Sequence, residues 1–209
     1  SHIVELTLSQ LEAATGSLGA LERIGSGSFG DVLLLRAGSG FDAFAEVEGK
    51  DVALKVGWSG DCDEEFVAEL EALATLRDPH LVHLLAFAVE NDTRVLVLEY
   101  MAGGSLDRRL REPGTSLTWH HRLRVAVDVS AALFYLHDGA SVVHGDVKTS
   151  NVLLDKYGGA KLSDFGLCRK RHGRLPGPVS ASSPSASASA SPAADVFAFG
   201  VVLMELITG

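Results

Sequence analysis

The sequence contains few cysteines: Cys62 and Cys168 are the two in 209 residues, and they lie far apart. Two cysteines are too few for a disulfide-stapled scaffold, and this pair lacks the short spacing of a metal site. Basic residues are also scarce, since 18 Lys and Arg against 27 Asp and Glu leave a net charge of -9. We therefore expect no nucleic-acid partner and a cytoplasmic domain in a reducing compartment.

A long hydrophobic run is missing as well. The longest, Val196–Leu203 with its continuation to Ile207, includes Glu205 and is too short to cross a bilayer. We therefore expect no membrane segment in this chain. Hydrophobic residues nevertheless make up 46% of the sequence, enough to bury the core of a globular protein of one or two domains.

The most informative stretch is HGDVKTSNVLLD, residues 144–155, because it places an acid, a cation and a carboxamide close together. Phosphoryl transfer needs this set: Asp146 to orient an attacking hydroxyl, Lys148 to lie against the transferring group, and Asn151 to hold a magnesium ion. A second candidate metal ligand, Asp164, follows in SDFGL.

Taken singly, Asp146 and Asp164 could be ordinary turn acids beside Gly145 and Gly166. However, the stretch with Asp146 precedes the stretch with Asp164, which is the order that a phosphoryl-transfer site of this kind requires, and each stretch follows a short apolar run. This combination favours the catalytic interpretation.

The two stretches match the catalytic loop and the DFG motif of protein kinases, so the sequence resembles a protein kinase domain of the plant receptor-like serine/threonine group. The resemblance implies an α+β, bilobal, protein-kinase-like fold. It has a small antiparallel lobe of five strands with one helix, and a mainly helical large lobe. It also implies ATP and Mg²⁺ as ligands and proteins as substrates. Lys148, two residues after Asp146, favours a serine/threonine kinase.

By this resemblance the chain divides into five segments. They are an N-terminal extension at 1–18, a small lobe at 19–100, a large lobe with the catalytic loop and DFG motif at 101–172, a disordered Ser/Ala/Pro-rich stretch at 173–193, and helix αF at 194–209.

A glycine-rich loop of the form GxGxxG lies near the N-terminus, where absent side chains let backbone amides approach phosphate oxygens. Alone, this pattern could be a plain hairpin turn. The resemblance assigns nucleotide contacts to the whole loop: Ile24, Gly25, Ser26, Gly27, Ser28, Phe29, Gly30 and Val32.

Lys55 stands in VALK on a strand-like alternation, where the family places the lysine that contacts the α and β phosphates. The alternative is a snorkelling edge-strand lysine. Glu69 projects from the apolar face of a predicted helix over residues 61–77, so we pair it with Lys55, with Glu65 as the second choice.

The adenine contacts come from the resemblance alone. They are Ala53, Leu98 at the back of the pocket, the backbones of Glu99 and Met101 in the hinge, and Leu153 beneath the base.

Other elements are predicted from patterning. We expect a short helix over Val4–Thr15 capped by Thr7 or Ser9, a hairpin of 83–90 and 93–99, and a long helix from Thr118 to Gly139. No cysteine or acid completes a metal set around His120, His121 and His137, so we expect surface or packing roles for them.

The sequence departs from the family pattern at two places. Gly145 replaces the arginine that commonly precedes Asp146, which is typical of the non-RD subgroup, where a phosphorylated loop has no arginine to bind. The Ser-rich stretch lacks the APE motif, and the resemblance resumes at Asp195, in the place of a buried aspartate that supports the catalytic loop. We therefore expect a domain truncated after helix αF.

Three functions remain open. The first is an ATP-dependent serine/threonine kinase of receptor-like type, attached in a full-length receptor to the cytoplasmic side of the plasma membrane. The second is an ATP-binding pseudokinase or truncated scaffold with little transfer activity. The third is a small-molecule phosphotransferase, which substrate preference would distinguish.

Overall fold

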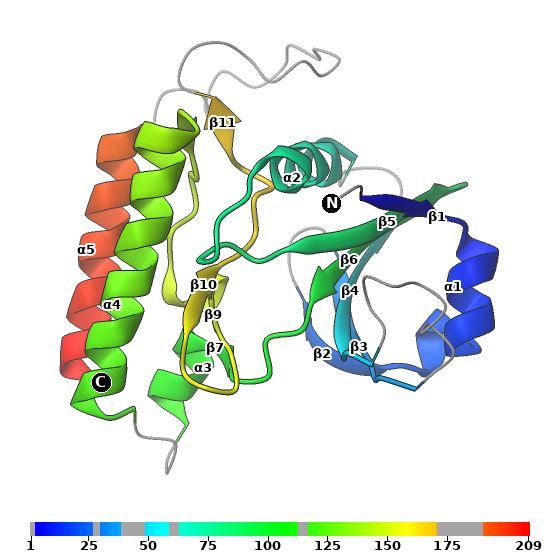
Figure 1. Ribbon diagram of the computed structural model, residues 1–209, viewed down its shortest axis with the longest axis horizontal. Helices are drawn as coiled ribbons and strands as arrows, with labels where there is room; N and C mark the ends of the chain where they lie inside the picture. Colours follow the sequence, from blue (N-terminus) through cyan, green and yellow to red (C-terminus); the bar gives the residue numbers. More distant parts are fainter. Residues whose placement is uncertain (1–2, 27–29, 39–48, 59–62, 113–116, 171–189) are drawn as a thin grey trace. The chain divides into compact units, whose positions relative to one another are not determined.

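The computed structural model describes residues 3–26, 30–38, 49–58, 63–112, 117–170 and 190–209. The chain divides into two compact units. The first comprises Ser1–Thr75 and His83–Tyr100, and the second comprises Leu76–Val82 and Met101–Gly209 (Figure 1). A strand-rich unit and a helix-containing unit confirm the predicted α+β class.

The first unit is built on a six-stranded sheet in the order β1-β5-β6-β4-β3-β2. Neighbouring strands are antiparallel except for β1 and β5, which are parallel. The strands are β1 Val4–Leu6, β2 Glu22–Ser26, β3 Asp31–Leu35, β4 Val52–Trp58, β5 Leu84–Glu90 and β6 Thr93–Glu99. The five antiparallel strands expected for the small lobe are β2 to β6, and residues 4–6 of the N-terminal extension add a sixth strand at the edge of the sheet.

The N-terminal helix is shorter than expected, since α1 spans Leu8–Thr15 and the residues before Thr7 form β1. Thr7 is the N-cap: its Oγ1 accepts a hydrogen bond from the Gln10 amide at 3.2 Å, and Gln10 Oε1 accepts one from the Thr7 amide at 2.8 Å. This reciprocal capping box satisfies two backbone donors that a helix start leaves without intrahelical partners.

Helix α2 spans Asp63–Thr75 and begins with three acids, which suits the positive end of a helix dipole. The prediction that Arg77 lies in its last turn is wrong, because the helix ends at Thr75. Buried Phe66, Ala72 and Leu73 form its apolar face, and Glu69 lies among them.

The second unit contains the helices α3 Leu106–Arg111, α4 Trp119–Phe134 and α5 Pro192–Thr208, with a π-helical turn at Tyr135–Gly139 after α4. A three-stranded sheet has the order β10-β9-β7, and β11 pairs with β8. These strands are β7 Gly104–Ser105, β8 Val142–Val143, β9 Val152–Leu154, β10 Ala160–Leu162 and β11 Arg169–Lys170.

Helices α4 and α5 lie side by side and antiparallel (Figure 1). Arg122 Nη1, near the start of α4, donates to the carbonyl oxygen of Leu206, near the end of α5. Helix α5 begins at Pro192 behind the N-cap Ser191, two residues before the predicted boundary at 194. The rest of the predicted Ser-rich stretch, up to residue 189, lies outside the described residues.

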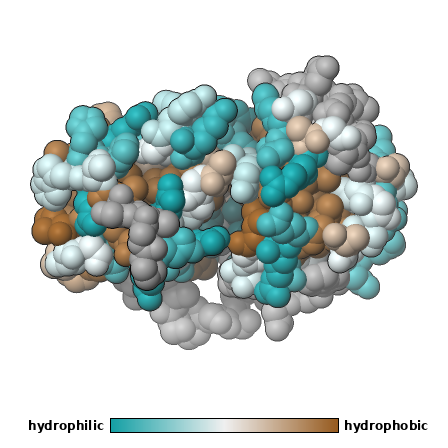
Figure 2. All heavy atoms as spheres, turned by 90° about the horizontal axis from the view of Figure 1, so that it is seen from below, coloured by the Kyte–Doolittle hydropathy of each residue, from teal (hydrophilic) through white to brown (hydrophobic). Residues whose placement is uncertain are grey.

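Apolar side chains also lie on the outer surface of this helix pair, seen as brown patches at the left of Figure 2. The exposed large apolar side chains of the two helices are Trp119, Leu123, Val127, Phe134, Val196, Phe197, Val201, Met204 and Ile207. Despite this apolar character, none of the helices in the described residues has the length and hydropathy needed to cross a membrane.

Candidate active site

Lys55 and Glu69 form a buried ion pair within the first unit. The Lys55 Nζ lies 2.6 Å from Glu69 Oε2, and the two side chains are 8% and 2% exposed. Lys55 is presented by β4 and Glu69 by α2, so the pair ties the helix to the central sheet. A buried pair of this kind is strongly destabilised when one partner is removed, because the other charge stays behind without compensation.

The glycine-rich loop is described at its two ends. Gly25 is paired with Val32 across β2 and β3, and a Cβ on Gly30 would lie 1.9 Å from the carbonyl oxygen of Val56. Glycine is therefore required at position 30, where the loop meets the strand that carries Lys55. Gly27, Ser28 and Phe29 lie outside the described residues; Ser26 is exposed, and Ile24 is half-buried.

The residues assigned to adenine are distributed over both units. In the first, Ala53 and Leu98 are buried and opposite each other on β4 and β6. The Glu99 carboxylate accepts a hydrogen bond from the backbone amide of His83 at 2.8 Å. In the second, Met101 is buried and Leu153 is half-buried on β9.

The catalytic-loop candidates converge on one carboxylate. Asp146 Oδ2 accepts hydrogen bonds from Lys148 Nζ at 2.7 Å and from Asn151 Nδ2 at 2.9 Å. Asn151 Nδ2 also donates to the backbone oxygen of Asp146 at 2.9 Å. Because the Asn151 amide turns its nitrogen toward Asp146, its Oδ1 is the atom that can coordinate a cation.

Asp195 on α5 holds the backbone that leads to Asp146. Its Oδ2 accepts from the His144 amide at 2.8 Å, and its Oδ1 accepts from the Gly145 amide at 2.9 Å. The Nε2 of His137 donates to Oδ2 as well, at 2.8 Å. Asp195 is only 2% exposed, and a buried charge needs hydrogen-bond partners. These three donors supply them. The structure therefore places Asp195 where the resemblance predicted it.

His144 is fully buried and links the catalytic loop to the segment around Asp164. Its Nε2 donates to the Ser163 carbonyl at 3.1 Å, and its Nδ1 accepts from the Asp146 amide at 3.2 Å. Its ring also meets that of Phe165 edge-on, with centroids 4.9 Å apart. Burial lowers the pKa of His144, so the imidazole is neutral with its proton on Nε2.

Asp164 lies two residues after the end of β10 and has a φ of 66°, an uncommon backbone conformation for a residue other than glycine. The preceding Ser163 donates from both its amide and its hydroxyl to the Asn151 carbonyl, each at 2.9 Å. The two candidate magnesium ligands therefore lie on segments that are hydrogen-bonded to each other. Strained residues of this kind concentrate at functional sites.

Gly145 has a φ of 83°, and a Cβ there would lie 2.9 Å from the carbonyl oxygen of Leu167. The segment after Phe165 therefore approaches the catalytic loop closely, and β11 pairs antiparallel with β8, with Arg169 opposite Val143. A larger residue at position 145 would have to displace this segment.

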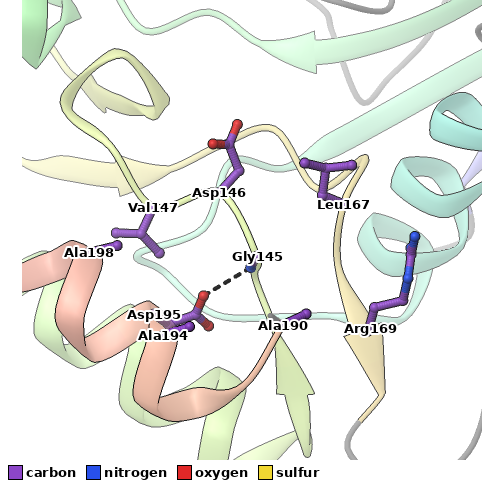
Figure 3. Close-up of a pocket in the computed structure, with 9 residues that line it drawn as sticks. All are labelled: Gly145, Asp146, Val147, Leu167, Arg169, Ala190, Ala194, Asp195 and Ala198. Carbon is purple, nitrogen blue, oxygen red and sulfur yellow. Dashed lines mark hydrogen bonds between the residues drawn. The ribbon is translucent and has the colours of Figure 1, made fainter. Parts of the chain in front are cut away.

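A cavity of about 290 Å³ opens beside Asp146 in the second unit (Figure 3). Alanines of α5 and apolar side chains near the catalytic loop make most of its wall. The lining residues are Gly145, Asp146, Val147, Leu167, Arg169, Ala190, Ala194, Asp195 and Ala198.

In the described residues, no group of three or more His, Cys, Asp and Glu side chains is placed to hold a metal ion. Asn151 and Asp164 suit magnesium in the manner of nucleotide enzymes, in which one or two protein ligands act together with substrate phosphates.

Sequence reasoning gave no specific role to two of the site's histidines. His137 was expected on a helix surface or in packing, and His144 entered only as the first residue of the catalytic stretch. Their contacts with Asp195, Ser163 and Phe165 are made across long sequence separations. The signals available in the sequence were His137 near the end of the predicted long helix and His144 at the start of the catalytic stretch, and a single histidine is too common to interpret alone.

Comparison with known proteins places the chain among kinases. Residues 18–209 match the family model of protein tyrosine and serine/threonine kinases. A probable LRR receptor-like serine/threonine-protein kinase of Arabidopsis thaliana is 38% identical, and the alignment covers 98% of this chain and 22% of the relative. The Arabidopsis thaliana protein BRASSINOSTEROID INSENSITIVE 1 is 36% identical, and the alignment covers 98% of this chain and 18% of that protein. A receptor protein kinase of Oryza sativa subsp. japonica is 36% identical, and the alignment covers 100% of this chain and 24% of that protein. The chain thus spans a quarter or less of each of these relatives.

Proposed function

The chain belongs to the protein kinase family, and we propose that it transfers the γ-phosphoryl group of ATP to serine or threonine hydroxyls of proteins, within a larger receptor-like signalling protein. The observation that carries this proposal is the Asp146 carboxylate, which is hydrogen-bonded to Lys148 and Asn151 and held in place through Asp195. These groups match the requirements of phosphoryl transfer: an acceptor for a hydroxyl proton, a mobile cation and a metal ligand.

Lys55 binds the α and β phosphates in this proposal, and Glu69 orients it. Its ammonium is desolvated on an apolar strand and already paired at 2.6 Å. A preformed, buried cation loses little conformational freedom when a phosphate arrives, which favours nucleotide binding.

Asn151 Oδ1 and Asp164 would hold magnesium, which would supply positive charge to neutralise the charge that develops on the phosphate oxygens. The hydrogen bonds from Ser163 to the Asn151 carbonyl keep the two ligand segments together. The strained backbone at Asp164 supports a functional rather than a purely structural role for this turn.

Asp146 orients the acceptor hydroxyl and accepts its proton. Its partner Lys148 is 52% exposed and Asp146 itself 28%, so their ion pair is worth little. Lys148 can therefore leave Asp146 and lie against the transferring phosphoryl group. The cavity beside Asp146 gives an acceptor residue space to approach.

The apolar residues Ile24, Val32, Ala53, Leu98 and Leu153 would contact the adenine, and the backbones of Glu99 and Met101 would hydrogen-bond with its edge. This assignment rests on the family pattern. The burial of Ala53 and Leu98 at opposite strand positions supports it.

We also propose that the chain belongs to the non-RD subgroup, which Gly145 supports, and that phosphorylation in the stretch from Ser180 to Ser191 does not switch activity on. The close approach of Leu167 O to Gly145 supports this, because an arginine at position 145 would have to displace the segment that carries Leu167. We further assign the domain to the cytoplasmic side of the membrane in a full receptor, as for receptor kinases.

A second candidate function is an ATP-binding pseudokinase or scaffold. It is favoured by one sequence observation: residues 173–193 contain no APE motif, the family's signature for the segment that positions a peptide. In this case the site binds nucleotide but transfers little phosphate.

The distinguishing experiment measures transfer of labelled γ-phosphate to a generic protein substrate. We expect transfer by the unmodified chain and a loss of about 100-fold or more in Asp146→Asn, typical for removal of a general base. Asp138→Asn, an exposed acid after α4, is the matched control and should retain transfer. Nucleotide binding without transfer in all three proteins would favour the scaffold.

A further inference from the structure

The two faces of strand β4 have different neighbours. Val52, Leu54 and Val56 belong to a buried apolar cluster on one face of the sheet. Ala53 and Lys55 alternate with them and face the other way, where Lys55 meets Glu69 of α2. The position of Lys55 thus depends on contacts on both faces of the strand.

The face opposite Lys55 is covered by the N-terminal segment. Leu6 and Leu11 belong to the same buried cluster, and Leu11 is fully buried. Leu8, Leu18 and Leu21 are partly buried against it. We call residues Val4–Thr15, which comprise β1 and α1, the N-terminal cover. It lies outside the family match, which begins at residue 18.

Specific hydrogen bonds fix the N-terminal cover in place. Strand β1 pairs with β5, with Leu6 opposite Ala88. The Leu8 amide donates to Glu90 Oε2 at 2.9 Å, which joins the first turn of α1 to the end of β5. Together with the capping box at Thr7, these bonds hold Leu11 against the cluster.

We infer that the N-terminal cover positions Lys55 for nucleotide binding, with Leu11 as a positioning residue that acts through β4. The inference rests on the proposed role of Lys55 with ATP. Protein interiors are close-packed, so a cavity made behind β4 lowers the stability of the chain. It also lets the strand move into the space that has opened. A binding group that shifts by a fraction of an ångström binds its ligand less well.

The test compares Mg-ATP dissociation constants, each measured well below the melting temperature of the variant. Leu11→Ala should weaken binding about three- to tenfold, within the range of couplings transmitted through packed side chains. Leu11→Met, which conserves volume, should restore binding. Val89→Ala, on β5 but exposed and outside the cluster, is the matched control and should bind like the unmodified chain.

A double-mutant cycle shows whether Leu11 acts through Lys55. In a Glu69→Gln background, where the ion pair that holds the Lys55 amine is already lost but the amine remains, Leu11→Ala should weaken nucleotide binding little further, although it still lowers the melting temperature. An equal loss in both backgrounds would overturn the inference, and so would a Leu11→Ala chain that melts lower but binds Mg-ATP normally.

A second readout needs no nucleotide. Leu11→Ala should speed acylation of the Lys55 amine, measured by mass spectrometry at a temperature where the chain is folded, because its pair with Glu69 loosens. Acylation of Lys50, which is exposed just before β4, should not change. If the unmodified chain does not bind Mg-ATP, the proposed function fails. Unchanged Lys55 acylation would instead contradict the inference by itself.

Discussion

His137 donates a hydrogen bond from Nε2 to Oδ2 of Asp195, at 2.8 Å, and both side chains are buried. The π-helical turn after α4 presents this histidine, and α5 presents the aspartate. The same carboxylate receives the backbone amides of His144 and Gly145. The interaction between two distant helical segments therefore sets the backbone that carries Asp146.

We predict that Asp195→Asn destabilises the chain by about 3 kcal/mol and lowers phosphate transfer. The amide replaces one acceptor oxygen with a donor and leaves a buried N–H without its partner. Chemical denaturation measures the stability, and transfer is assayed on the folded protein. Asp138→Asn, an exposed acid, serves as control; equal stability of the two variants would contradict the prediction.

We predict that Lys55→Ala abolishes the thermal stabilisation that Mg-ATP gives the unmodified chain, since the phosphate-binding cation is removed. The apo variant should also be less stable by about 3 kcal/mol, because the buried Glu69 loses its ion pair with Lys55. Differential scanning fluorimetry with and without Mg-ATP measures both effects. An undiminished shift on addition of Mg-ATP would show that Lys55 does not bind the nucleotide.

The pairing of Lys55 with Glu69 could be predicted from the sequence because it follows from the chemical type and the position of each residue. Lys55 and Glu69 are charges placed on apolar faces, and such charges need partners. The structure joins them at 2.6 Å. The start of α4 after Thr118 could also be predicted from the sequence, because an N-cap residue and apolar periodicity are local signals.

Features that depend on contacts between distant residues could not be predicted. Strand β1 is three residues long and exists because β5 offers a free edge 82 positions away, with Val4 opposite Ala86. The resemblance placed Asp195 itself, but its hydrogen bond from His137 is likewise set by tertiary packing rather than by a local pattern. The positive φ of Asp164 could not be predicted from the sequence either, since an aspartate before Phe165 is compatible with several turn conformations.

We predict that His144 makes stability sensitive to acid. Burial lowers the pKa of His144 below the ordinary value of 6.5. This effect outweighs the nearby carboxylates of Asp195, Asp164 and Asp146, which raise the pKa. The unfolded chain therefore binds a proton more readily than the folded chain. The stabilisation from the neutral imidazole is complete above the unfolded pKa and is lost as the pH falls from there toward the folded pKa.

The measurement is the free energy of unfolding from neutral pH downward, for the unmodified chain and His144→Gln. The glutamine variant does not titrate in this range, so its stability should fall less steeply below about pH 6.5. Identical slopes in the two proteins would show that His144 is not the group responsible.

We predict that Gly145→Ala destabilises the chain by about 1 to 3 kcal/mol and lowers transfer, since it combines a positive φ with a close approach to Leu167 O. Gly104→Ala is the matched control: it has a φ of 71°, but a Cβ there meets no atom within 4 Å. Denaturation and transfer assays should show the larger loss at position 145. Equal losses at the two sites would mean that the contact with Leu167 is unimportant.

The last prediction is that the chain binds Mg-ATP but transfers phosphate to proteins slowly. Asp146, Asn151 and Asp164 can assemble the charge-stabilising groups, but in-line transfer also requires that the acceptor hydroxyl be held at attacking distance. The family positions its peptide with a segment that ends in APE, and residues 173–193 contain no such motif. Binding should therefore survive while turnover stays low.

The test replaces the residues between Lys170 and Ala190 with a complete activation segment from a receptor-like kinase. A graft of the same length with the APE motif scrambled is the control. Transfer to a protein substrate should rise in the first graft and not in the second, and the Mg-ATP dissociation constant should stay the same in both. Equal transfer by the ungrafted chain and the complete graft would show that the segment is dispensable. The peptide would then be held by the cavity beside Asp146 and the surface around it.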